Sequence, residues 1–245
     1  MKLNQNLQTV KVSVVFPAYN EVDVLENTVQ KVIENLDKYT DSYEIIIAED
    51  GSTDGTSKLA ANLTKKNPLI KHIHGTNRLG RGNALRNSFK KSKGETLVYM
   101  DLDLATDLNH LKELITSINI EGFDLATGSR LLPESEVDRS WTRHIASSSY
   151  NLMVRLLLGS RIKDHQCGFK SFRRGALLCL LNEVEARHWF WDTEILVRAN
   201  LKGYKIKEIP VLWKSGKETK VRLLEDSVNM FWQALSLWWK IKIRK

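Results

Sequence analysis

Cysteine is scarce in this sequence, and a long hydrophobic run is absent. The 245 residues include two cysteines, Cys167 and Cys179, which are too far apart for a CxxC motif and too few for a disulfide framework. No apolar stretch approaches the roughly 18 residues that cross a bilayer. The first residues also lack the apolar core and cleavage site of a signal peptide. We therefore expect a protein of the reducing cytoplasm without a transmembrane segment.

The motifs of several large enzyme classes are also missing. The turn after the first apolar run reads PAYNEV and has no glycine, which argues against a GxGxxG dinucleotide site. The chain has no P-loop, no HExxH and no GxSxG, and its histidines are scattered without metal-ligand spacing. His72 and His74 alternate along one short apolar segment. We expect them to be surface or core residues rather than metal ligands.

Positive charge is plentiful, and there are enough apolar residues for a core. The formal net charge of +8 and the pI near 9.4 indicate an anionic partner. Nucleic acid, a lipid surface and a phosphorylated small molecule all satisfy that condition, and charge alone does not choose among them. Hydrophobic residues make up 42% of the chain, which is sufficient for one packed domain.

Strands and helices are predicted to alternate along the chain. Residues at helical spacing separate apolar runs that read as strands, at 11–19, 42–50, 70–75, 95–103 and 123–129. Asn20 is expected to cap the first helix. This alternation is typical of an α/β fold whose mainly parallel sheet is flanked by helices on both faces. We expect one domain at 1–222, followed by a C-terminal amphipathic helix at 223–245.

Polar residues follow the predicted strands, at the edge where parallel sheets bind ligands. Residues two apart on a strand share a face, so Asp101 and Asp103 point the same way if the extended conformation persists. Two carboxylates that close require a positive partner. Hard oxygen ligands suit Mg²⁺ or Mn²⁺, with phosphate oxygens completing the shell. The sequence therefore predicts a divalent cation that carries a diphosphate.

A family resemblance is carried by four motifs in order: VVFPAYNE, AEDGSTDGT, DLD and ATGSR. Together they resemble the family 2 glycosyltransferases, which implies a Rossmann-like GT-A fold. The second half, with DHQCGFKSFRR and FWDTEIL, resembles the dolichyl-phosphate sugar synthases, and the glucosyltransferases more than the mannose enzymes. The resemblance implies an inverting, metal-dependent hexosyltransferase that moves a sugar from a nucleotide-sugar to a polyprenyl phosphate. UDP-glucose is the favoured donor and GDP-mannose the alternative.

The resemblance also assigns donor-binding residues. It implies a nucleotide pocket floor of Pro17, Tyr19 and Glu21, and a hydrogen bond from the base to Asp50. Metal, ribose and phosphates would be bound by a second group, namely Asp101, Leu102, Asp103 and Arg130, with both aspartates as metal ligands. Relatives often have a polar metal ligand two residues after the second aspartate, where this sequence has Ala105. Water, Asp107 or the phosphates would then complete the shell.

Acceptor and catalytic roles follow in the same way. The resemblance implies that Arg143, Ser147 and Gln166 bind the lipid phosphate. Lys214, Lys217 and Lys220 resemble a basic segment that closes over the donor, and Lys220 joins Asp101, Asp103 and Arg130 as a catalytic residue. A phosphate monoester is already anionic and needs no general base, unlike a sugar hydroxyl. Asp192 and Glu194 are therefore expected to be positioning or structural residues.

The C-terminal segment bears on where the protein works. Apolar residues recur at helical spacing in 223–245, including Trp238 and Trp239, and the segment ends in basic residues. A helix of this kind suits the membrane–water interface and anionic lipid. The alternatives are a helix packed on its own domain and a dimer contact. We expect peripheral attachment to the cytoplasmic face of a membrane, directly or through an anchoring partner.

Two functions from other classes compete with this interpretation. A nucleotidyltransferase would also use paired carboxylates, but it usually has a glycine-rich basic signature after its first strand, which PAYNEV is not. A nucleic-acid-binding module would use the basic cluster at 78–93. That cluster lacks interleaved aromatic residues, and the carboxylates would repel phosphates in the absence of metal. We expect no nucleic-acid partner.

Overall fold

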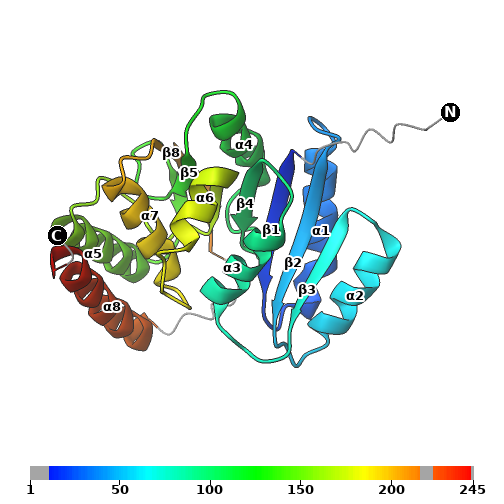
Figure 1. Ribbon diagram of the computed structural model, residues 1–245, viewed down its shortest axis with the longest axis horizontal. Coiled ribbons are helices and arrows are strands. Elements are labelled where there is room, and N and C mark those ends of the chain that lie inside the picture. The colour runs from blue at the N-terminus through cyan, green and yellow to red at the C-terminus, as the bar shows by residue number, and fades with distance from the viewer. Residues whose placement is uncertain (1–10, 216–222, 244–245) are drawn as a thin grey trace.

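A seven-stranded sheet forms the centre of the computed structural model, which describes residues 11–215 and 223–243 (Figure 1). Its strand order is β3-β2-β1-β4-β7-β5-β8. The strands are β1 (Val12–Ala18), β2 (Tyr43–Asp50), β3 (Ile70–Gly75), β4 (Thr96–Met100), β5 (Leu125–Ser129), β7 (Phe169–Arg173) and β8 (Ile206–Pro210). All neighbouring pairs are parallel except the two made by β7. The predicted mainly parallel α/β fold is confirmed.

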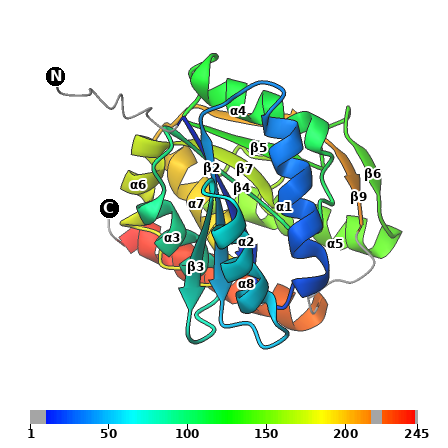
Figure 2. The same cartoon turned by 90° about the vertical axis from the view of Figure 1, so that its right-hand side faces the viewer.

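Helices cover both faces of this sheet (Figure 2). One face packs against the apolar sides of α1 (Val22–Leu36), α2 (Thr56–Lys66) and α4 (Leu111–Asn119). The other packs against α3 (Arg81–Lys91), α6 (Arg174–Leu181) and α7 (Trp191–Leu201). Val14 and Val15 of β1 belong to opposite cores. Burial on both faces explains why the strands are continuous apolar runs rather than alternating ones.

Two further helices lie side by side beyond the β5–β8 end of the sheet (Figure 1). They are α5 (Trp141–Leu158) and α8 (Leu223–Ile243). Ala234 and Leu237 of α8 are buried against Val154 of α5 and Val197 of α7. The C-terminal helix therefore packs on its own domain. Among the described helices, none is both long and apolar enough to cross a bilayer.

The remaining short elements complete the edge of the fold near α5. β6 (Glu136–Asp138) and β9 (Leu212–Lys214) form a separate two-stranded parallel sheet, and the 3₁₀ helix η1 (Leu108–His110) precedes α4. Thr106, just after the DLD motif, bridges to Trp213 of β9. The small sheet thus ties the segment after β4 to the chain that leads toward α8.

Candidate functional site

The turns after β1 and β2 are tied together by hydrogen bonds. Asn20 has a positive φ of 53°, and its Oδ1 accepts the Thr53 N–H at 2.8 Å. Its own N–H donates to Ser52 Oγ. Asn20 therefore bridges two turns, and its expected role as the cap of α1 is wrong: Asp54 Oδ2 accepts the Val22 N–H instead. These two hydrogen bonds hold the PAYNE and GSTDGT turns next to each other.

Asp50 holds the loop that follows β3. Its two carboxylate oxygens accept the N–H groups of Leu79 and Gly80, each at 2.8 Å. The carboxylate is buried. The hydrogen bond from a nucleotide base that the resemblance implies would therefore use carboxylate lone pairs that the Leu79 and Gly80 N–H groups do not occupy. The same loop places the Arg78 guanidinium 3.9 Å from the centre of the Tyr19 ring. Tyr19 and Asp50 thus lie at one edge, as predicted, and both also organise the loop.

The carboxylate pair lies in a turn rather than at the end of an extended strand. β4 ends at Met100, and Leu104 has a positive φ of 49°. The strand was expected to continue through Asp103, so it ends three residues earlier than predicted. After Met100 the chain turns and no longer pairs as a strand. The Asp103 side chain is solvent-accessible, yet partial desolvation and the neighbouring Asp101 charge raise its pKa. The two carboxylates are close together by virtue of this turn.

A positive partner for the pair comes from Arg81, at the start of α3. Arg81 Nη2 lies 2.6 Å from Asp101 Oδ1. The guanidinium is largely buried and sits 5.4 Å from the Tyr99 ring and 5.1 Å from the Trp189 ring. Sequence analysis did not identify Arg81. Its only signal was a charged residue between two glycines in the GRG stretch that opens a helix.

Gly168 explains part of the QCGFK motif. The Asp101 N–H donates to the Gly168 carbonyl at 3.1 Å. A Cβ added at Gly168 would lie 1.9 Å from Asp101 Oδ2, closer than any real contact. Glycine is therefore required for the carboxylate to lie against β7. Leu102 is buried between the two aspartates, and its carbonyl accepts the Thr28 hydroxyl, so it positions the turn.

Behind the pair lies a buried lysine–aspartate contact. Lys170 Nζ lies 2.8 Å from Asp192 Oδ1 and also donates to the carbonyls of His165 and Cys167. Burial raises the pKa of Asp192 and lowers that of Lys170. Glu194 accepts two backbone N–H groups and pairs with Arg198 at 2.7 Å. These contacts give both acidic residues structural partners.

Arg130 forms a buried two-pronged ion pair. Its Nε and Nη2 lie 2.7 and 2.9 Å from the two carboxylate oxygens of Asp164. Proximity to Arg130 keeps the pKa of Asp164 well below its usual range despite the burial that opposes this shift. Arg130 therefore reaches the site with two of its five side-chain N–H donors engaged by Asp164. Asp164 was not identified from the sequence, because the pairing depends on two segments far apart in the chain.

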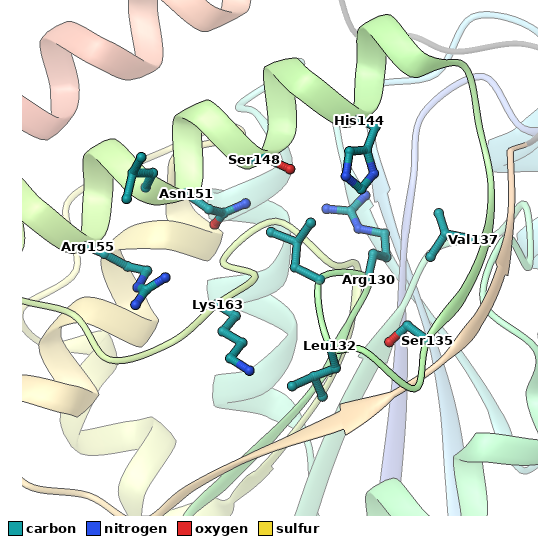
Figure 3. Close-up of a pocket in the computed structure, with 11 residues that line it drawn as sticks. Arg130, Leu132, Ser135, Val137, His144, Ser148, Asn151, Arg155 and Lys163 are labelled. Carbon is teal, nitrogen blue, oxygen red and sulfur yellow. The ribbon is translucent and has the colours of Figure 1, made fainter.

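A cavity of about 550 Å³ opens beside Arg130 (Figure 3). Figure 3 shows it between one face of α5 and the segments that carry Lys163 and Leu132. Its lining combines cationic, polar and apolar side chains, namely Arg130, Arg155 and Lys163, then Ser135, His144, Ser148 and Asn151, and finally Leu131, Leu132, Val137 and Leu152. Such a lining suits a molecule with an anionic head and an apolar body.

None of the predicted acceptor residues, Arg143, Ser147 and Gln166, lines this cavity. Arg143 and Ser147 each precede by one position a lining residue of α5, so they point about 100° around the helix from the cavity. Arg143 donates to Ser215 at 2.9 Å. Ser147 Oγ is buried without a hydrogen-bond partner among the described residues. Gln166 donates to Thr193 Oγ1 at 2.7 Å.

The predicted basic segment is described only in part. Lys214 ends β9, and its backbone N–H donates to the Ala105 carbonyl beside the carboxylate turn. Lys217 and Lys220 lie outside the described residues. Asp107 accepts the Asn109 N–H and so caps η1, which gives it a role other than metal binding.

Comparison with known proteins places the chain in a family. The model of "Glycosyl transferase family 2" matches residues 13–181. Glycosyltransferase AglD of Haloferax volcanii is 47% identical over 237 residues, covering 96% of this chain and 38% of AglD. Dolichyl-phosphate beta-glucosyltransferase of Saccharomyces cerevisiae is 31% identical over 246 residues, covering 93% of this chain and 74% of the yeast protein.

The fold has solved counterparts as well. Glucosyl-3-phosphoglycerate synthase from Mycobacterium tuberculosis, solved with Mn²⁺, UDP and phosphoglyceric acid, superposes with a TM-score of 0.66 at 21% identity. The match covers 92% of this chain and 76% of that one. At this identity the likeness concerns the fold alone. The sequence matches decide the family, and the chain belongs to glycosyl transferase family 2.

Proposed function

We propose that this chain transfers a hexose from a nucleotide-sugar to a polyprenyl phosphate. The observation that carries the proposal is the cavity beside Arg130, whose lining joins three cationic side chains with polar and apolar ones. A lipid phosphate has the same two features, an anionic head and an apolar chain. The resemblance of the chain to a dolichyl-phosphate glucosyltransferase supports the same acceptor class.

The donor would bind at the strand ends, and its metal at Asp101 and Asp103. These two side chains suit Mg²⁺ or Mn²⁺ as metal ligands, because both carboxylates supply hard oxygen atoms. Asp103 is exposed beside Asp101, so a cation can reach its carboxylate from solvent. When bound, the cation neutralises the departing diphosphate. The similarity to a dolichyl-phosphate beta-glucosyltransferase supports UDP-glucose over GDP-mannose as the donor.

Pro17, Tyr19, Glu21 and Asp50 would form the nucleotide side of the pocket. The bridged turns after β1 and β2 hold these residues at one edge. Arg130 would meet phosphate charge from the neighbouring strand end, and Lys214 would approach from the end of β9. Lys220 would join it as part of the same basic segment.

Among the described residues, Asp192 is engaged by Lys170 rather than available as a base, which is consistent with a phosphate acceptor. Asp192 occupies the position where family relatives keep a catalytic base, but here it is buried and paired with Lys170 at 2.8 Å. A phosphate oxygen needs no deprotonation at neutral pH, so a base is not required. Arg143, Ser147 and Gln166 would orient that oxygen, with the buried Ser147 hydroxyl as its donor.

Attachment to a membrane surface would bring the enzyme to its acceptor. α5 and α8 are adjacent and carry exposed apolar side chains, including Leu156 at 78%, Trp232 at 64% and Trp239 at 62% exposure. Tryptophan and leucine on a partly basic surface suit the headgroup region of a bilayer. In this proposal the surface would attach to the cytoplasmic face of the membrane.

Two alternatives differ in substrate. GDP-mannose would use the same carboxylates and acceptor cavity. A sugar nucleotidyltransferase would bind a nucleoside triphosphate and a sugar phosphate instead. A screen of UDP-glucose, GDP-mannose and UTP against short polyprenyl phosphates and sugar phosphates, with Mn²⁺ or Mg²⁺, separates all three. Failure of every polyprenyl phosphate to accept sugar would overturn the proposal.

Arg143→Ala is expected to raise the apparent KM for lipid phosphate and leave donor affinity nearly unchanged. Loss of a hydrogen bond to a charged group costs about 1.5–3 kcal/mol, or roughly ten- to a hundredfold in KM. Initial rates at varied acceptor and calorimetric donor binding measure the two effects. The control is Arg161→Ala, which removes an exposed arginine from the segment after α5. Loss of donor binding with normal acceptor dependence would reverse the assignment.

A further inference from the structure

Three potential metal ligands gather where β2 meets the edge strand β3 (Figure 1). Glu49 lies opposite His74 in the parallel register, and Ile47 lies opposite His72. Residues two apart on a strand share a face, so both imidazoles point to the side of the Glu49 carboxylate. Sequence analysis gave these histidines no role as ligands. The missing information was the register that brings Glu49 alongside them.

The ligand atoms have spacings close to those of a tetrahedral site. Glu49 Oε2 lies 2.5 Å from His74 Nδ1 and 3.7 Å from His72 Nε2, and all three atoms lie within 4.8 Å of one another. Zinc bonds of about 2.0–2.1 Å in a tetrahedron separate neighbouring ligand atoms by about 3.3 Å. Both separations from Oε2 lie within about 1 Å of that spacing. Small rotations of the exposed His74 side chain would bring the three ligand atoms to tetrahedral spacing.

A second observation points to a ligand. His72 Nε2 is buried and has no hydrogen-bond partner among the described residues, and the imidazole is 11% exposed. Its 3.7 Å separation from Glu49 is too long for a hydrogen bond. A buried polar atom without a partner is costly, and a cation would satisfy it.

The surroundings of the cluster orient it as a metal site requires. The other oxygen of Glu49 accepts the Ser52 N–H, which fixes the carboxylate. Ser57 Oγ lies 3.3 Å from His74 Nδ1, where it would meet a water on the open fourth position. In the sheet, β1 and β2 separate β3 from β4, the strand that leads to Asp101 and Asp103.

We propose that Glu49, His72 and His74 form a second metal site, selective for Zn²⁺ and separate from the carboxylate pair. Two imidazole nitrogens favour zinc over Mg²⁺, which prefers an all-oxygen shell. The ion would tie the edge strand β3 to β2. Through the Glu49–Ser52 bond it would also stabilise the GSTDGT turn. The site is independent of which sugar the protein transfers.

Zinc titration of the tag-free, chelator-stripped full chain tests the proposal. Competition with a chromophoric chelator should show one tight equivalent of Zn²⁺, and Co²⁺ should give the visible absorption of a tetrahedral complex. His74→Ala should weaken Zn²⁺ binding by about a hundredfold or more, because loss of a ligand exceeds the loss of an outer-shell partner. His74 is half exposed, so this variant keeps the fold even where His72→Ala does not.

Two controls make the result decisive. His188→Ala removes an exposed histidine far along the chain and should leave zinc affinity unchanged. Asp103→Asn should also retain the tight equivalent, because it alters only the carboxylate pair. Absence of tight zinc binding, or binding that Asp103→Asn abolishes and His74→Ala spares, would overturn the second site.

Discussion

Asp103→Asn is expected to abolish metal-dependent donor binding while the fold stays intact. Asp103 Oδ1 accepts the Ala105 N–H at 3.0 Å, and an asparagine oxygen can accept the same bond. The turn therefore survives, whereas the charge that attracts a divalent cation is lost. Calorimetry of UDP-glucose with Mn²⁺ should show a loss of at least about a hundredfold in affinity, or about 2.7 kcal/mol. A melting curve should remain nearly unchanged.

The choice of Asp103 over Asp101 rests on their different partners. Asp101 is paired with Arg81 at 2.6 Å and packs against Gly168, so its removal would leave a largely buried arginine without its counter-ion. That loss would disturb the fold and confuse the result. Asp103 is exposed, and its carboxylate accepts a hydrogen bond that an asparagine can also accept. Its replacement therefore reports on the cation.

A matched control for this experiment is Asp41→Asn, which removes one exposed carboxylate before β2. It changes the net charge by the same amount and should leave donor affinity as in the unmodified chain. Unchanged donor affinity of Asp103→Asn in the presence of Mn²⁺ would show that the carboxylate pair does not bind the metal. Equal weakening by both variants would indicate a general charge effect instead.

The first half of the fold was predictable because its signals are local. Each of the strands β1, β2 and β4 is an apolar run that ends in a polar turn, and the helices between them keep a 3.6-residue period. The antiparallel strand β7 was not predicted, since in its sequence FKSFR a lysine and a serine separate the two phenylalanines and no apolar run results. Lys170 is buried there by its contacts with Asp192 and two carbonyls, which only the tertiary fold provides.

The contrast between local sequence signals and long-range contacts also applies to the candidate site. Asp101 and Asp103 were found because they follow an apolar strand, although the turn that joins them differs from the predicted extended chain. Arg81 and Asp164 were missed because an ion pair between distant segments leaves no periodic trace in the sequence. Burial of these groups is set by neighbours from other elements, and no window of residues contains that information. Short polar motifs after the strands identified the edge of the sheet that holds the site. The ion pairs at that edge are set by tertiary packing.

Replacing Trp232 and Trp239 by alanine together is expected to release the protein from vesicles that contain anionic lipid. Both side chains are more than 60% exposed on α8. Burying a large apolar side chain contributes about 1.5–3 kcal/mol, so the pair supplies about 3–6 kcal/mol of attachment. The partition coefficient should fall by at least about a hundredfold. Activity on a long polyprenyl phosphate should fall far more than activity on a short soluble analogue.

This double variant is sharper than deletion of the helix. α8 also buries Ala234 and Leu237 against α5 and α7, so truncation would open the core and lower stability as well as attachment. Substitution of the two exposed tryptophans leaves that packed side intact, and the melting temperature should change little. Ile120→Ala, at the end of α4 and 78% exposed, is the control for loss of an exposed apolar side chain elsewhere.

Salt dependence separates the two contributions to attachment. Lysines near an anionic surface add about 1 kcal/mol each, and salt screens that term but not the apolar one. Raising salt should therefore weaken flotation of the unmodified chain without abolishing it, and should abolish the residual flotation of the double variant. If the exposed tryptophans instead form a dimer contact, the variant would become monomeric in size-exclusion chromatography and flotation would not change. That outcome would end the membrane interpretation of α8.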